Sequence, residues 1–456
     1  MNIWLVLAAG ALTMLTRLDA GDLRFDGVLY AQVARELVER GDWLDLTLGG
    51  DPYWRKPPLG FWLMGAAYRI GGVSEAMARL PAALGGVLAA VVLCRLATRL
   101  WDARVGLVAG VILATTSPFV QNAVTARLDT LQTLFTLLCV LAYVRAADSR
   151  RTIDFAFAGA CFGLAVLVKG VFGLMGPLVF VLYCITTDRL RTLASRGFVV
   201  SLLVGIGVAL PWHAYQVARS GRAFLDVYLF EQTVDRFTGQ LAGYQDTRPY
   251  WSHLLRDDWP WLPLRLAGVV LAIGAARRGD RRAAFLLLWT LGYLAVVSLS
   301  AGQRGRYLIP LYPPASILAA LALLRALPER WRARVPATVA GLCVAGALVV
   351  LALPARRSNA AADLRALGPV LDRLAPGARA VDGYRLPDLA IRASFLFYVG
   401  RDLRNRRRPE ELTDGVIVAD LGRRDELAAA GFAPAYASGR FVVMSRNVVA
   451  GSGKES

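Results

Sequence analysis

The chain has 456 residues, 56% of them hydrophobic, and its mean hydropathy is +0.46. This composition excludes an ordinary soluble globular domain and is typical of a multi-pass α-helical membrane protein. The net charge of +18 rests on arginine, because only three of the 52 basic residues are lysines, Lys56, Lys169 and Lys454.

Apolar runs close to the length that crosses a bilayer, about 20 residues, recur along the first three quarters of the chain. The first run has no small-residue cleavage site, so we interpret it as a retained helix and not as a signal peptide. Residues 1–353 are predicted to form a transmembrane domain, and residues 354–456 a soluble domain and tail. The eleven helices that we expect lie at about 2–18, 76–94, 105–120, 128–144, 153–168, 171–187, 198–217, 259–275, 283–301, 307–324 and 335–353.

The connections between these helices alternate in charge. With the amino terminus in the cytoplasm, the inward-facing connections carry 17 arginines against five acidic residues, as the positive-inside rule requires. The carboxyl-terminal domain then lies on the outer side. Topology and contact with anionic lipids therefore explain the net charge, and nucleic-acid binding is not predicted.

Two long external connections, 19–75 and 218–258, separate the helices. Within the first, GVLYAQVARELVER (27–40) and PPLGFWLMGAAYRIG (57–71) are too short or too mixed to span, and we expect them to be amphipathic helices along the external membrane surface. The two prolines that follow Lys56 favour a helix start there, which would hold the ammonium near that end of the helix.

The carboxyl-terminal region is predicted to be a small α/β domain. Helical patterns occupy 362–374 and 423–431, and strand patterns occupy 378–384, 415–421 and 439–446. No glycine fingerprint follows a strand, so nucleotide binding is not supported. We interpret the domain as a cap that shapes the acceptor site, and its basic run RNRRR as a patch facing solvent or lipid headgroups.

The distinctive polar residues of the membrane domain fall on its external side. Polar residues on both faces would indicate side chains that snorkel to the membrane surface. Their convergence on one face instead predicts one site at the external membrane boundary. The candidate residues are Asp26, Lys56, Arg127, Asp129, Lys169, Arg236, Tyr244, Arg248, Arg304, Arg306 and Tyr307.

The chemistry of these residue types suits a lipid-linked phosphate. A lysine ammonium or an arginine can hold the phosphate and stabilise its charge when it departs. Either carboxylate, that of Asp26 or that of Asp129, can accept the proton of an acceptor hydroxyl or amine. Together they predict displacement at a sugar carbon attached to polyprenyl phosphate, through an oxocarbenium-like state.

Each carboxylate also has a structural interpretation. Asp129 can form an ion pair with Arg127 that anchors a helix end, and Asp26 can cap the helix that follows it. Neither role excludes catalysis.

Metal and cofactor chemistry has little support in the sequence. All five cysteines lie within or at the edge of predicted helices, and the two histidines, His213 and His253, are far apart. This pattern contains no disulfide framework and no metal-ligand motif. We assign no cofactor, and a divalent metal stays open as an alternative that no ligand motif supports.

Two functions of other classes compete with an enzyme. A secondary transporter or flippase should have repeated halves with broken mid-membrane helices, and the sequence has no such repeat. A non-catalytic scaffold for envelope assembly would need the interfacial helices and the outer domain but not Asp26. Substitution of that aspartate separates the scaffold from the enzyme.

The polar motifs resemble those of a known group of enzymes. FDGVLYAQVARELVERGDW, PYWRKPPLGFWL, ARLDTLQTLF, LVKG, FEQTVDRFTG with RPYWSHLL, and RYLIPLYP stand in the order seen in bacterial GT-C glycosyltransferases. The chain is most similar to the aminoarabinose transferase branch, which is related to the protein O-mannosyltransferases, over roughly residues 1–325.

The resemblance implies a role for each motif. Asp26 matches an aspartate assigned to catalysis or acceptor positioning, and Asp129 a second acid that lines the cavity. Lys56 matches the lysine that binds undecaprenyl phosphate. The other implied phosphate ligands are Arg236 and Tyr307. From the chemistry of the residue types we add Lys169 as a phosphate ligand, with Arg127, Arg304, Arg306 and Arg55 in support. The implied location is the bacterial cytoplasmic membrane, and the implied acceptor is a lipid, a glycan or a protein.

One position departs from the family pattern. The family often has glutamate before the lysine, where this chain has Arg55. The departure argues against a metal bound at that position, and it indicates that the acceptor can differ from lipid A.

Overall fold

The structure is a computed structural model, and it describes residues 2–16, 18–235, 238, 248–300, 303–352, 361–386, 389–413 and 415–446. The chain divides into two compact units. The first unit comprises residues 1–18, 43–45 and 53–355, and the second comprises 19–42, 46–52 and 356–456. Two stretches of the first loop therefore pack with the carboxyl-terminal residues, which sequence reasoning did not anticipate.

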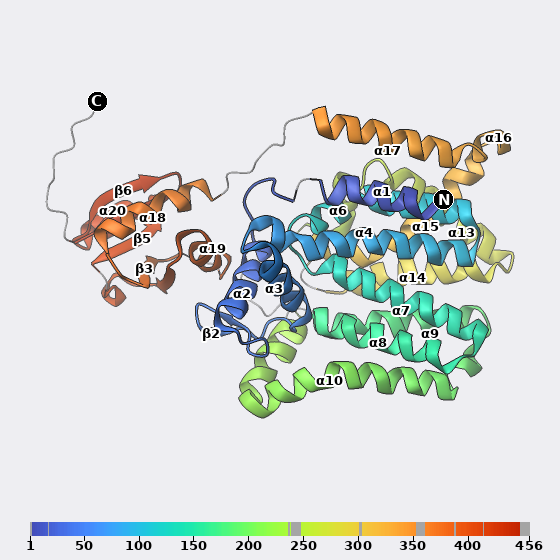
Figure 1. Cartoon of the computed structure of the whole chain (residues 1–456), viewed down its shortest axis with the longest axis horizontal. Coiled ribbons are helices and arrows are strands. Elements are labelled where there is room, and N and C mark those ends of the chain that lie inside the picture. The colour runs from blue at the N-terminus through green and yellow to red at the C-terminus, as the bar shows by residue number, and fades with distance from the viewer. Residues whose placement is uncertain are drawn as a thin grey trace. The chain divides into compact units, whose positions relative to one another are not determined.

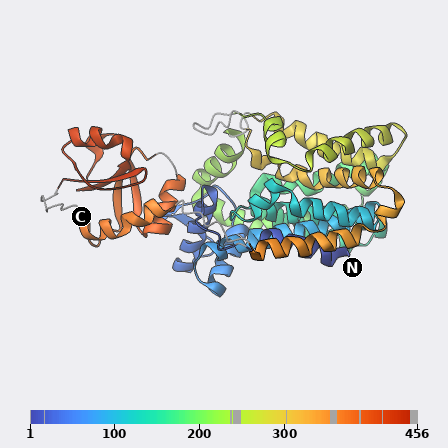
Figure 2. The same cartoon turned by 90° about the horizontal axis from the view of Figure 1, so that it is seen from above.

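The first unit is a bundle of helices, most of which run side by side (Figures 1 and 2). Short helical segments join several of them, namely η1 (Gly170–Leu174), η3 (Asp226–Asp235, a π-helix) and η4 (Gly305–Leu311). The α-helices are α1 (Asn2–Met14), α3 (Leu59–Gly71), α4 (Glu75–Leu100), α5 (Ala103–Thr115), α6 (Ser117–Ala123), α7 (Asp129–Ser149), α8 (Thr152–Lys169), α9 (Met175–Thr186), α10 (Arg196–Leu225), α12 (Tyr250–Asp257), α13 (Leu262–Arg277), α14 (Arg281–Ser298), α15 (Tyr312–Ala326), α16 (Glu329–Arg332) and α17 (Val335–Ala352).

Many of these helices are apolar enough to cross a membrane. Within the described residues, six helical stretches are long and apolar enough to span, or eight if the bent pairs α5–α6 and α12–α13 each count as one span. Shorter apolar helices lie at Ile3–Met14 and Val335–Val349. The chain is thus a multi-span helical protein, while the count of eleven remains a prediction.

One of these stretches, Thr152–Thr186, is a hairpin. Lys169 at the end of α8 reaches Asp129 at the start of α7, whereas Arg189, just after α9, donates to the carbonyl of Ala147 near the end of α7. The helices α8 and α9 therefore run in opposite directions along α7. Gly170 makes the reversal possible with a φ of +59°, which side chains with a Cβ rarely adopt.

Polar caps mark several helix starts. Asp102 accepts from the amides of Arg104 and Val105 before α5, and Asp280 accepts from two amides at the start of α14. Such caps satisfy amide groups that have no partner within the helix. Both caps lie within predicted inward-facing connections that are rich in arginine. The aspartate and the arginines together therefore mark these helix starts in the sequence.

A buried ion pair joins three helix junctions of the bundle. Arg265 of α13 lies 2.8 Å from a carboxylate oxygen of Asp258, and both side chains are almost fully buried. The same guanidinium donates to Thr116 at the α5–α6 bend and to the carbonyl of Tyr312 at the start of α15. An intramembrane charge persists only when it is paired in this way. Arg265 therefore fixes three interrupted helices relative to one another.

The second unit is built on a five-stranded sheet of order β4-β3-β5-β7-β6. The central strand β3 pairs in parallel with β4 and β5, whereas β7 pairs antiparallel with β5 and β6. The strands are β3 (Ala380–Tyr384), β4 (Asp402–Arg406), β5 (Val416–Asp420), β6 (Ala433–Ser438) and β7 (Phe441–Ser445), and the helices of this region are α18 (Ala362–Leu374), α19 (Leu389–Val399) and α20 (Arg424–Ala429).

The first-loop residues of this unit form α2 (Asp26–Arg40) and the short hairpin β1 (Thr47–Leu48) and β2 (Asp51–Pro52). Most residues from Gly27 to Leu37 are buried, and α2 packs on α19. The prediction that α2 lies along the membrane surface is therefore wrong for its apolar face, because protein covers that face. Its amphipathic pattern is equally compatible with either kind of cover.

A single carboxylate holds α2 against the β1–β2 turn. Glu36 accepts hydrogen bonds from the hydroxyl of Thr47 and from the amides of Gly49 and Gly50. Gln32, one turn earlier in α2, donates to the same carboxylate. Because the Glu36 side chain is buried, these donors replace the water that it loses.

Candidate functional site

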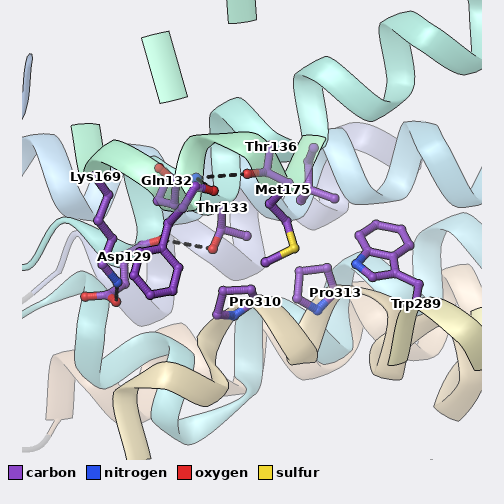
Figure 3. Close-up of a pocket in the computed structure, with 11 residues that line it drawn as sticks. Asp129, Gln132, Thr133, Thr136, Lys169, Met175, Trp289, Pro310 and Pro313 are labelled. Carbon is purple, nitrogen blue, oxygen red and sulfur yellow. Dashed lines mark hydrogen bonds and ion pairs between the residues drawn. The ribbon is translucent and has the colours of Figure 1, made fainter. Parts of the chain in front are cut away.

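The centre of the candidate site is an ion pair between α7 and α8. The ammonium of Lys169 lies 2.5 Å from Oδ1 of Asp129, and the two side chains are only 11% and 7% exposed. Asp129 is the first residue of α7 and Lys169 the last of α8, so the antiparallel pairing of these helices brings the two residues together. Figure 3 shows the two side chains meeting at one edge of the pocket.

The alternative pairing of Asp129 with Arg127 is wrong. Asp129 takes its ion-pair partner from α8, and Nε of Arg127 is buried with no hydrogen-bond partner among the described residues. Ala126 precedes Arg127 with a φ of +56°, which is strained for a residue with a Cβ. Proximity in the sequence therefore does not decide the partner of Asp129.

Aromatic rings surround the Lys169 ammonium. It lies 4.8 Å from the centre of the Phe172 ring and 5.9 Å from that of Tyr307, and the two rings are stacked. Tyr307 belongs to η4, and Tyr293 of α14 donates a hydrogen bond of 2.6 Å to its carbonyl. The negative faces of the two rings stabilise the ammonium in addition to its ion pair.

The pocket next to this pair is narrow. Figure 3 shows it between α7 on one side and the proline-rich start of α15 on the other. Its volume is about 10 Å³, about what one water molecule needs. It is lined by Asp129, Gln132, Thr133, Thr136, Leu137, Lys169, Phe172, Met175, Trp289, Pro310 and Pro313.

Lys56 lies just before α3, and its ammonium donates to the carbonyl of Arg55 at 3.0 Å. The Arg55 guanidinium lies 3.1 Å from Glu231 of η3, and Gln232 donates to the same carboxylate. The position where the family often has glutamate is thus paired with a glutamate from another segment. This pair fixes the backbone that accepts from Lys56.

The Lys56 segment and the Asp129 helix are close neighbours. Gly60 in the first turn of α3 packs against the side chain of Leu128, the residue before Asp129. On another side, Trp54 meets Phe224 edge to face, and Phe224 stacks on Tyr228. Any Cβ on Gly170 would lie 2.8 Å from the Tyr228 hydroxyl. One aromatic cluster therefore connects the segments that carry Lys56 and Lys169.

Two further arginines lie close to Tyr307. Arg304 directly precedes η4, and the Arg306 guanidinium lies 5.7 Å from the centre of the Tyr307 ring. The Tyr307 ring is thus in contact with both the Arg306 guanidinium and the Lys169 ammonium. Two other expected residues, Arg236 and Tyr244, are outside the described residues.

Asp26 belongs to the second unit. It is the first residue of α2, and the residue at the cap position is Phe25, which makes no capping hydrogen bond. The expectation that Asp26 caps α2 is therefore wrong, because the helix starts one residue earlier than the sequence pattern indicated. Phe25 has φ +50° and ψ −128°, and such strain often accompanies a functional residue.

Sequence reasoning missed three contributors to the site. Gln132 donates to the carbonyl of Phe172, Phe172 stacks on Tyr307, and Glu231 holds Arg55. Gln132 could have been found from its spacing, since it lies one turn after Asp129 on the same helix face. No local signal indicates the other two contacts.

The described residues contain no group of three or more histidine, cysteine, aspartate or glutamate side chains placed to hold a metal ion. The acidic groups near the site are each paired with a cation, as in Asp129 with Lys169 and Glu231 with Arg55. The site as described is therefore organised around positive charge.

Sequence comparison shows what this chain is similar to. Residues 55–215 match the profile of the dolichyl-phosphate-mannose-protein mannosyltransferase family. Two undecaprenyl phosphate-alpha-4-amino-4-deoxy-L-arabinose arabinosyl transferases of Pseudomonas fluorescens are 29% and 30% identical, over 70% and 69% of this chain and 55% and 58% of their own. The chain thus spans little more than half the length of these relatives.

Solved structures have the same fold. The ArnT protein of Cupriavidus metallidurans, bound to undecaprenyl phosphate, superposes with a TM-score of 0.77 at 18% identity, and 99% of each chain is covered. An oligosaccharyltransferase of Archaeoglobus fulgidus superposes with a TM-score of 0.60 at 14% identity, covering 94% of this chain and 69% of its own.

Proposed function

We propose that this chain is a member of the superfamily of GT-C membrane proteins that includes the aminoarabinose transferases and the protein O-mannosyltransferases, and that it transfers a sugar from a polyprenyl phosphate carrier to an acceptor. The relatives are named for undecaprenyl phosphate and aminoarabinose, so we propose undecaprenyl phosphate as the carrier. The sugar itself and the acceptor, which is a lipid, a glycan or a protein, stay open.

One observation carries the proposal. The buried Lys169–Asp129 pair lies at the same end of the bundle as Lys56, beside the Tyr307 ring. This arrangement concentrates cations at helix ends, where a phosphate on a membrane-embedded lipid can reach them. A transporter would need such charges at the membrane midplane instead.

We propose the following division of roles. Lys56, Arg236, Tyr307 and Lys169 hold the donor phosphate, and Arg127, Arg304, Arg306 and Arg55 support them. An acceptor oxygen or nitrogen attacks the sugar carbon, the bond from that carbon to the phosphate oxygen breaks, and the phosphate leaves with the electron pair. The cations stabilise its added negative charge.

The proton of the acceptor needs a base. We assign it to Asp26, and we assign to Asp129 the task of holding Lys169 in place within the cavity. Asp129 is held in a buried ion pair with that ammonium, which suits it to a positioning role. This step does not require a metal, because the proposed lysine and arginine side chains stabilise the charge of the departing phosphate.

We also propose an orientation in the bacterial cytoplasmic membrane. The amino terminus lies in the cytoplasm, eleven helices span, and residues 354–456 form an external domain. Reporter fusions after Arg150, Arg196 and Arg281 should report cytoplasm, and fusions after Arg222 and Leu364 the outside. A cytoplasmic signal after Leu364 would overturn this orientation, because it would separate the proposed site residues onto two sides.

The decisive experiment compares the lipid-linked sugars and envelope glycans of cells with and without this chain by mass spectrometry. Its loss should leave a sugar-loaded carrier and remove one glycan modification. In proteoliposomes, the purified protein should then release free polyprenyl phosphate from that carrier when the acceptor is present. Movement of the intact carrier between leaflets without cleavage would instead identify a flippase.

A further inference from the structure

A polar network in the second unit surrounds the two residues that precede the Arg24–Asp26 turn. The carboxylate of Asp22 accepts from the amide of Ala361 at 2.7 Å and pairs with Arg365 of α18 at 2.6 Å. The amide of Leu23 donates to the hydroxyl of Tyr398 in α19 at 2.7 Å. The Arg365 guanidinium lies 4.5 Å from the centre of the Tyr398 ring.

These contacts form one continuous network. Asp22 and Leu23 are adjacent in the chain, their partners Arg365 and Tyr398 touch each other, and both first-loop residues are buried. Further along α2, Arg35 donates to the carbonyl of Phe397. Contacts from α18 and α19 thus hold the segment leading into α2 and then α2 itself.

The position of Asp26 depends on this anchoring. Asp26 is the first residue of α2, and the preceding Phe25 adopts φ +50°, a conformation that costs of order 1–3 kcal/mol. The Phe25 side chain is 67% exposed, so its own packing does not supply that energy. Such a conformation persists only when its surroundings determine it, and the fixed points on its amino-terminal side are Asp22 and Leu23.

We propose that the carboxyl-terminal region is a positioning element of the transfer site, in which Arg365 and Tyr398 set the direction of the Asp26 carboxylate through Asp22 and Leu23. The expected effect of Arg365 and Tyr398 on the transfer rate rests on the proposed function. Their expected effect on the structure of the loop does not.

The sharpest test is Tyr398→Phe, which removes one hydroxyl and leaves the ring under Arg365 in place. The turnover number for sugar transfer should fall about three- to tenfold, the size expected for one lost hydrogen bond that orients a reacting group. Binding of undecaprenyl phosphate should be unchanged, because Lys56 belongs to the first unit. Tyr436→Phe in β6 is the matched control, since no hydrogen bond from that hydroxyl is found among the described residues.

A double-mutant cycle identifies the route of the effect. In an Asp26→Asn background, Tyr398→Phe should cause no further loss, because the carboxylate that it orients is gone. An equal loss in both backgrounds would show that Tyr398 acts elsewhere and would overturn the proposal. Arg365→Lys, which keeps the charge beside Asp22, provides a second variant with the same expected pattern should the first prove poorly folded.

Hydrogen exchange separates failure of this inference from failure of the proposed function. Peptides covering residues 20–30 should exchange faster in Tyr398→Phe than in wild type or Tyr436→Phe, whatever reaction the protein catalyses. Unchanged exchange overturns the anchoring. Faster exchange with normal turnover overturns the positioning role, and a wild-type chain that transfers no sugar overturns the proposed function alone.

Discussion

Lys169 and Asp129 form an ion pair that is almost completely removed from solvent and joins the end of α8 to the start of α7. Breaking such a pair is expensive because the remaining charge is left buried without a partner, at a cost of about 3–5 kcal/mol. Removing either charge of this pair at the candidate site should therefore also destabilise the helix bundle.

The first prediction follows from this coupling. Lys169→Met should lower the thermal stability in detergent strongly, because Asp129 is left unpaired. The double variant Lys169→Met with Asp129→Leu should recover much of that stability and still lack transfer activity. Thermal unfolding of the two single variants and the double variant measures this. Additive losses in stability would show that the two charges do not interact as the distance indicates.

The second prediction concerns the other lysine near the site. Lys56→Ala should nearly abolish donor binding, and Lys56→Arg should restore it poorly, since a planar fork replaces a compact charge. Affinity for undecaprenyl phosphate, measured by calorimetry in detergent, reports the change. Lys454→Ala is a matched control because it removes the only other lysine of the chain besides Lys169. Equal donor affinity in Lys56→Ala and the control would remove Lys56 from the phosphate site.

A third prediction addresses the Arg55–Glu231 pair. Both side chains are partly exposed, so the pair itself contributes at most about 1 kcal/mol to stability. Its expected role is geometric, since the Arg55 carbonyl accepts from Lys56. Arg55→Glu should weaken donor binding by bringing two glutamates together, and the added Glu231→Arg should restore much of it. Donor affinity in the single and double variants tests this, and a double variant as weak as Arg55→Glu would contradict it.

The fourth prediction is about the carboxylate of Asp26. Asp26→Asn should lower turnover by about a hundredfold or more, within the ~10²–10⁴ usual for a general base, with donor binding intact. Stability should change little, because Asp26 is not the residue at the cap position of α2. Rates with saturating donor, together with the unfolding midpoint, measure both effects. Near-normal turnover would assign Asp26 a structural role and leave Asp129 as the candidate base.

The sequence placed Asp129 and Lys169 on the same side of the membrane domain, but it did not pair them. A helix that starts at Asp129 and a neighbour that ends at Lys169 place both residues at one end of an antiparallel pair, provided that apolar runs define the spans. Tyr307 follows for the same reason, since it stands at the start of another long apolar run. Local periodicity and polar breaks carry this information.

Partner choice could not be read from the sequence. Arg127 is two residues from Asp129, yet the ion-pair partner of Asp129 is Lys169 from another helix. In the same way, an amphipathic pattern shows that α2 has an apolar face but not whether lipid or α19 covers it. The strands β4 and β6 were missed because their residues are largely polar or exposed and lack the alternation of a half-buried strand. Each of these features is decided by tertiary contacts.

The packing of α2 on α19 has a practical consequence for dividing the molecule. A fragment cut at residue 353 would keep every predicted transmembrane helix, but it would leave the apolar face of α2 and the carboxylate of Asp22 without the residues that cover them. Such a fragment should aggregate through the bared helix or lose order around Asp26. A fragment that keeps α2 therefore also has to keep α18 and α19.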